Sequence, residues 1–68
     1  MAPHQQRVVE ERIELQKKIE ALDTFVHGSF IRSLDIEEQQ RLEKQLGIMK
    51  QLEEVLSERI AFFLEHAA

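Results

Sequence analysis

Residues 42–64 read LEKQLGIMKQLEEVLSERIAFFL, and their apolar side chains recur at spacings of three and four, which is typical of an amphipathic helix. One set forms a first seam of Leu42, Leu46, Met49, Leu56, Ile60 and Phe63. Beside it lies a second seam of Ile48, Leu52, Val55 and Phe62. Together the two seams sweep roughly 200°, about twice the apolar stripe of an ordinary surface helix. One neighbouring helix therefore cannot cover both.

The first half of the chain supplies one such neighbour. Its apolar residues recur at spacings of seven, four, three and four, which predicts a narrower seam of Val8, Leu15, Ile19, Leu22 and Val26. Pro3 suits the first turn of a helix, where its missing N–H costs nothing. Gly28 suits a left-handed helix end about 25 residues later. We predict a helix over about 3–27.

A second helix start follows a short connection. Asp35 is the expected N-cap, with Glu38 three residues later completing an aspartate version of the capping box. The second helix is predicted over about 36–66, after a turn at 28–35. In that turn the large apolar residues Phe30, Ile31 and Leu34 are expected to fold back over the end of the helix pair. The sequence thus predicts an all-α fold, an antiparallel two-helix hairpin in a single domain over 1–68.

The register of the hairpin gives a first reason to expect self-association. Pairing the helices about a midpoint near residue 31 or 32 places Pro3 beside Ile60, so that residues 61–64 would project beyond the first helix. Hairpins below about 70 to 80 residues rarely stabilise themselves. We therefore predict a homo-oligomeric helical bundle, and its expected subunit interface consists of Ile48, Leu52, Val55, Phe62 and Phe63.

Composition excludes several function classes. The 68 residues carry 9 Lys and Arg against 13 Asp and Glu, and a net charge of −4 argues against DNA or RNA as partner. There is no cysteine, and the histidines at 4, 27 and 66 lack metal-ligand spacing, so neither a metal nor a cofactor is expected. No catalytic constellation is found, and we predict a non-enzyme. No apolar run is long enough to span a membrane, and no secretion signal is recognisable, so we expect a cytoplasmic protein.

Cationic and polar residues gather at one end of the predicted hairpin. His4, Arg7 and Arg59 meet there in the predicted register, beside the positive pole of the first helix, and Arg12 lies further in. The guanidinium group of arginine binds phosphate through two parallel hydrogen bonds, and the N-terminus of a helix attracts anions. The residues predicted to bind a small phosphorylated ligand are His4, Gln5, Arg7, Arg12 and Arg59. The alternative is that the arginines pair only with nearby acids, because Glu10, Glu11, Glu53, Glu54 and Glu58 occupy the same region.

The opening residues 3–11, PHQQRVVEE, resemble small phage-encoded proteins related to those of crAss-like phages. The later pattern of Leu34, residues 37–39, Leu42, Leu46 and Met49 fits the same family. Proteins of this architecture look like the anti-CBASS and anti-Thoeris sponges, which are oligomeric hairpins that sequester nucleotide messengers of bacterial immunity. The resemblance implies a phage origin and action in the host cytoplasm.

Together with the polar end of the hairpin, this resemblance implies a phage anti-defence protein. It would capture a cyclic oligonucleotide or a cyclic ADP-ribose-type messenger in pockets between its subunits, without catalysis. Two alternatives remain open. The second seam could dock onto a host protein and inhibit it. The chain could also be a structural coiled-coil module of a larger assembly.

Overall fold

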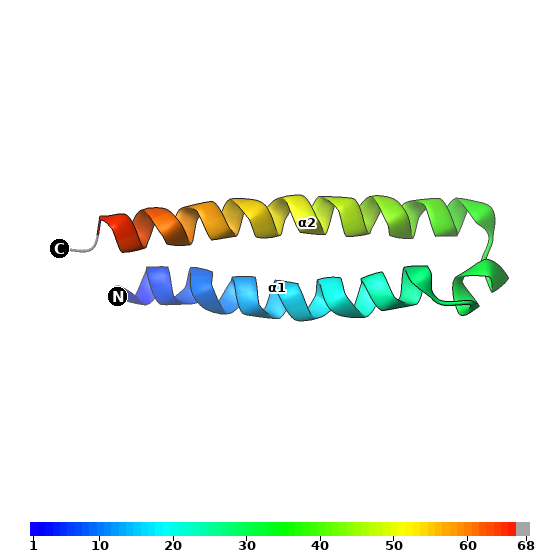
Figure 1. Cartoon of the computed structure of the whole chain (residues 1–68), viewed down its shortest axis with the longest axis horizontal. Coiled ribbons are helices and arrows are strands. Elements are labelled where there is room, and N and C mark those ends of the chain that lie inside the picture. Colours follow the sequence, from blue (N-terminus) through cyan, green and yellow to red (C-terminus); the bar gives the residue numbers. More distant parts are fainter. Residues whose placement is uncertain (67–68) are drawn as a thin grey trace.

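The computed structural model describes residues 1–66 and contains two long helices lying side by side (Figure 1). Helix α1 spans Pro3–His27, the 3-10 helix η1 spans Phe30–Ser33, and helix α2 spans Ile36–Glu65. The two long helices run antiparallel and form a rod of 52 × 15 × 14 Å (Figure 1). The all-α hairpin predicted from the apolar periodicity is therefore confirmed within the described residues.

Helix α1 begins and ends with local contacts of its own. The backbone N–H groups of Gln5 and Gln6 both donate to the Ala2 carbonyl at 3.0 Å, which closes the first turn. At the other end Gly28 donates its N–H to the Phe25 carbonyl at 3.2 Å. Its φ is −83°, so the left-handed conformation expected of Gly28 is wrong and the chain leaves the helix in an extended conformation.

Helix α2 begins after Asp35, as predicted, but not through a capping box. The Asp35 side chain caps no backbone N–H, and Glu38 instead accepts a hydrogen bond from Arg41 at 2.8 Å. The first turn still carries Glu37 and Glu38, and their negative charges interact favourably with the positive pole of the helix dipole. Gln39 donates its side-chain amide to the Leu34 carbonyl at 2.8 Å and ties the helix to the connection.

The connection buries only part of what the sequence predicted. Ile31 is 7% exposed and Leu34 is half-buried, so both close the end of the hairpin. Phe30 is 68% exposed, and its ring is tilted at 56° to that of Phe25, with 6.1 Å between the ring centroids. The prediction that Phe30 folds back into the hairpin is therefore wrong.

The core between the helices is built from the two predicted inner seams. Val8, Leu15 and Leu56 are buried, and Leu56 is only 1% exposed. Four partly buried residues pack against them: Ile19, Met49, Ile60 and Phe63. Burial of a large aliphatic side chain contributes about 1.5–3 kcal/mol to the free energy of folding. This cluster therefore holds α1 and α2 together in the middle of the rod and toward the end where α1 begins and α2 ends.

The register differs from the predicted one by about one helical turn. The predicted pairing of Pro3 with Ile60 would place Arg12 opposite residue 51, but Arg12 contacts Glu53 and Ser57. The shift brings the end of α2 nearly level with the start of α1, and only its last turn reaches slightly further (Figure 1). The predicted projection of residues 61–64 is thus largely wrong, because Phe63 packs on the intrachain core.

The second seam of α2 stays uncovered in a single chain. Its residues Ile48, Leu52, Val55 and Phe62 are 55%, 44%, 48% and 58% exposed. Isolated exposed apolar residues are normal, but these four follow one another at helical spacing along one side of α2, with Arg59 between the last two. In the described part of the chain no helix is long and apolar enough to cross a membrane.

Candidate ligand-binding site

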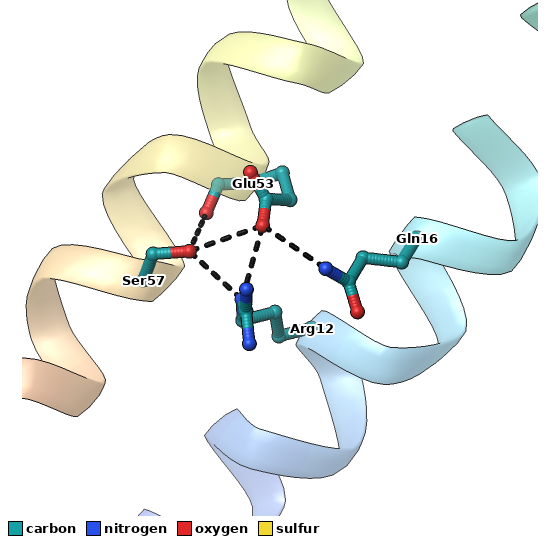
Figure 2. Close-up of polar contacts among 4 residues, drawn as sticks. All are labelled: Arg12, Gln16, Glu53 and Ser57. Carbon is teal, nitrogen blue, oxygen red and sulfur yellow. Dashed lines mark hydrogen bonds and ion pairs between the residues drawn. The ribbon is translucent and has the colours of Figure 1, made fainter. Parts of the chain in front are cut away.

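A polar network joins the two helices at Arg12 (Figure 2). The Arg12 Nε–H group donates to Glu53 Oε1 at 3.0 Å and to Ser57 Oγ at 2.8 Å. Glu53 Oε1 also accepts from the Gln16 side-chain amide at 3.4 Å, and the Ser57 hydroxyl lies 3.0 Å from both Glu53 Oε1 and the Glu53 carbonyl. The Arg12 and Glu53 side chains are 35% and 24% exposed, so the charges are only partly desolvated.

The helical spacing explains why these residues meet. Glu53 interrupts the first seam of α2 and thus points toward α1, where Arg12 occupies the edge of the facing seam. Ser57 follows Glu53 by four residues and therefore lies on the same face, one turn later. Ser57 and Gln16 were not predicted, although their spacing of four from Glu53 and Arg12 is the signal that could have found them. The ion pair is formed in this register of the two helices, and a shift of one turn would separate its partners.

Gln5, another predicted ligand residue, is engaged at the start of α1. Its Oε1 accepts a hydrogen bond from the Ala2 backbone N–H at 3.0 Å. The N–H groups of Gln5 and Gln6 are already bonded to Ala2, so the first turn offers fewer free donors than the sequence suggested. Gln5 could therefore donate a hydrogen bond to a ligand only through its side-chain NH2 group.

His4, Arg7 and Arg59 are all exposed. Arg7 precedes Glu11 by four residues and Lys18 by eleven, so these side chains share one side of α1. Arg59 follows Leu52 by seven residues and shares its side of α2. Glu11, Lys18 and Leu52 line one recess between the helices, which places Arg7 and Arg59 along the same side of the hairpin. Arg12 and Glu53 belong to the opposite side, where another recess is lined by Gln16 and Glu53.

Both recesses are shallow. Their volumes are about 220 and 240 Å³, below the roughly 300–1,000 Å³ of clefts that enclose small molecules. None of the residues predicted to bind a ligand lines either recess. Leu52, which was predicted in the subunit interface, lines the first. Neither of these two recesses between the described helices is therefore large enough to enclose a nucleotide.

The ion pairs within residues 1–66 distinguish two groups of cations. Arg12, Lys17, Arg41 and Lys50 each pair with a carboxylate, at N–O distances of 2.8–3.5 Å. Within the same residues Arg7 and Arg59 make neither an ion pair nor a side-chain hydrogen bond. Arg59 also interrupts the second seam, between Val55 and Phe62. The described part of the chain contains no cluster of three or more His, Cys, Asp or Glu residues that could hold a metal.

A protein-family model for Sequestin matches residues 2–62, which is most of the chain. The chain belongs to the Sequestin family. No curated protein and no solved structure matches it. The name of the Sequestin family indicates that its members sequester a small molecule, which is a binding role rather than a catalytic one. The match covers α1, η1 and α2 as far as Phe62, and hence every residue predicted to bind the ligand.

Proposed function

We propose that this member of the Sequestin family is a phage anti-defence protein that binds and sequesters a nucleotide immune messenger between the subunits of a homo-oligomer. The ligand class is a cyclic oligonucleotide or a cyclic ADP-ribose-type molecule, and it is held without catalysis in the cytoplasm of the infected cell. One observation carries the proposal: Arg7 and Arg59 lie on one side of the hairpin and have no acidic partner within residues 1–66. Unpaired guanidinium groups are suited to phosphate.

In the proposed site, different side chains bind different parts of the nucleotide. Arg7 and Arg59 bind phosphate oxygens, and His4 together with the Gln5 amide contacts ribose or base. Arg12, on the opposite side of the hairpin, is bonded through Nε to Glu53 and Ser57 and serves to join the two helices rather than to bind this ligand. The shallow recesses of one chain support a site completed by a second subunit, because a nucleotide needs more enclosure than about 220 Å³ provides.

The test is thermal unfolding against a panel of cyclic dinucleotides, cyclic trinucleotides and cyclic ADP-ribose isomers. A ligand present at 100 times its Kd adds about 2.7 kcal/mol to the stability of the folded protein. For a domain of this size each kcal/mol raises Tm by about 4–8 °C, so a true ligand gives a large and selective shift. A flat panel at high ligand excess contradicts the nucleotide proposal.

The site assignment is tested separately with Arg7→Ala and Arg59→Ala. Each variant removes charge-assisted hydrogen bonds to phosphate, and we expect Kd for the selected ligand to rise at least tenfold. Arg32→Ala is the matched control, because Arg32 is exposed in η1 at the far end of the hairpin and should leave the affinity unchanged. Unchanged affinity in both test variants removes these arginines from the site.

The exposed second seam also favours a second candidate function, inhibition of a host protein through helix-in-groove docking. The two functions differ in what the seam contacts. In a sequestering oligomer the seam is buried between identical chains, and the purified protein alone is an oligomer. An inhibitor remains a monomer until its host protein is added, which sedimentation velocity distinguishes directly.

A further inference from the structure

The second seam of α2 carries a heptad pattern that extends beyond its apolar members. Ile48, Leu52, Val55 and Phe62 are spaced by four, three and seven residues, and Arg59 fills the gap at the heptad position between Val55 and Phe62. Such a pattern is the signature of a helix that packs along its length against another helix. All four apolar members are 44–58% exposed, so α1 does not supply that second helix.

We propose that the occupant of this seam is the α2 helix of a second copy, running antiparallel, with Leu52 of each chain opposite Val55 of the other. The inference rests on the homo-oligomer of the proposed function and specifies its geometry. Two hairpins related in this way form a two-fold symmetric four-helix bundle.

Arg59 selects the antiparallel direction. In a parallel pair each heptad position meets its own copy, so two Arg59 guanidinium groups would share one layer of an apolar seam without an acid between them. In the antiparallel pair Arg59 lies opposite Ile48 of the partner. Its aliphatic stem then covers Ile48 while the charged head reaches the rim, as long cationic side chains do.

The residues that flank the seam select the same direction. Lys44, Gln51, Glu58 and Glu65 repeat every seven residues along its outer edge. A parallel pair would place this edge beside the other edge of the partner's seam, where Met49, Leu56 and Phe63 belong to the intrachain core, and would leave these charges without partners. The proposed antiparallel register instead brings Lys44 beside Glu65 of the partner and Gln51 beside Glu58.

The flanking residues also select the register. Sliding the antiparallel pair by one heptad in one direction opposes the two Glu58 carboxylates. Sliding it in the other direction places Arg59 opposite Arg41 and moves Phe62 to the acidic start of α2. The register with Leu52 opposite Val55 avoids both repulsions. It places these two apolar residues of each chain together at the centre of the seam, while Phe62 lies opposite Gln45 of the partner.

Helix α1 supports this arrangement independently. On the side that borders the second seam it carries charged residues at spacings of four, three and four: Arg7, Glu11, Glu14 and Lys18. Placing that face on the apolar seam of the partner would bury charges, so the two α2 helices meet each other.

The intrachain register then fixes what the two copies of α1 oppose. Leu15 lies level with Leu52, since both line one recess. The two-fold axis therefore passes close to Leu15 and brings Glu11 beside Lys18 of the partner. Within residues 1–66 neither Glu11 nor Lys18 has an ion-pair partner in its own chain. Glu14, which lies nearest the axis, already pairs with Lys17 at 3.3 Å.

This symmetry determines where ligands would lie. The His4, Arg7 and Arg59 side chains of one copy come to one end of the bundle, beside the Ile48 region of the partner. The two-fold operation repeats the arrangement at the other end. A dimer of this kind has two equivalent ligand sites, each formed by both chains.

The absence of cysteine from the sequence allows a clean cross-linking test. Lys44→Cys and Glu65→Cys are purified separately, mixed, and treated with a short bismaleimide. We expect a cross-linked dimer from the mixture and none from either variant alone, because two copies of residue 44 lie about 30 Å apart in the proposed register. Dimer cross-linking by Lys44→Cys alone, at a yield matching the mixture, indicates a parallel pair and overturns the proposal.

Charge reversal provides a second measurement on the uncross-linked protein. We expect Lys44→Glu to weaken self-association about tenfold, since two pairs per dimer become repulsive, and Glu65→Lys added to it to restore the affinity. Failure of the double variant to recover overturns the register. If the protein is still monomeric at 100 times the assay concentration, the proposed homo-oligomer is overturned as well. If the cross-link forms as expected but no nucleotide in the panel raises Tm, the nucleotide ligand is contradicted and the dimer geometry is supported.

Discussion

At the scale of single residues, the sequence around Arg12 allowed two interpretations of its side chain. It was predicted to bind a ligand, with pairing to a nearby acid as the alternative. Its Nε–H group is bonded to Glu53 and Ser57, in a half-buried position between the helices. The sequence placed Glu53 on the inward face of α2, but it offered five acids near Arg12 and no means of choosing among them, because the choice depends on a register shift of one turn.

The Arg12 network should contribute measurably to stability. Arg12→Ala removes a charge-assisted hydrogen bond and leaves the Glu53 carboxylate partly buried, which we expect to cost about 1–2 kcal/mol. Tm should fall by about 4–8 °C per kcal/mol for a domain of this size.

The matched control for Arg12 is Lys17→Ala. Lys17 pairs with Glu14 on the surface, where both side chains are more than 60% exposed, and such pairs contribute about 0–1 kcal/mol. Both variants are melted at equal protein concentration, because self-association makes Tm concentration-dependent. Equal Tm changes in the two variants would mean that the Arg12 network does not hold the helices together.

At the scale of the elements, the helices were more predictable than their ends and their relative position. Apolar spacing and Asp35 placed both helices, because these are local signals. The conformation of Gly28 and the exposure of Phe30 were not predictable locally, since both depend on how the connection crosses from α1 to α2. The predicted register assumed a symmetric turn, whereas η1 and the extended residues around it shift α2 by about one helical turn.

Gly47 in the middle of α2 gives a prediction that belongs to this scale. The residue is exposed, and a Cβ added there would meet nothing within 4 Å. Because Gly costs about 0.8–1.0 kcal/mol relative to Ala in a helix interior, Gly47→Ala should raise Tm by about 4–8 °C. Circular dichroism melting measures the change.

Gly28→Ala is the control for the helix variant. Its φ of −83° is accessible to alanine, but the added Cβ would lie 3.3 Å from the Thr24 carbonyl, so we expect no gain. A loss of stability in Gly47→Ala would contradict the open surface seen in one chain. It would show that another chain or a ligand approaches the α2 backbone at this point.

At the scale of the whole molecule, the free energy of folding depends on whether two chains associate. Within residues 1–66 the hairpin has five buried apolar residues, and it leaves the second seam exposed to water. Chains of this size rarely stabilise themselves with one core, so covering the second seam adds stability that the single chain lacks. The same sequence pattern that makes α2 apolar on two faces thus links stability to protein concentration.

Arg59→Leu separates association from ligand binding. In the antiparallel dimer the change replaces a charged residue opposite Ile48 with an apolar one, so we expect self-association to tighten at least tenfold, measured by sedimentation velocity. The same substitution removes a phosphate ligand, so we expect nucleotide affinity, measured by calorimetry, to fall at least tenfold. Arg32→Leu adds an exposed leucine in η1 and should change neither quantity. Weaker association in Arg59→Leu would mean that the guanidinium itself holds the chains together, and unchanged nucleotide affinity would place the phosphate elsewhere.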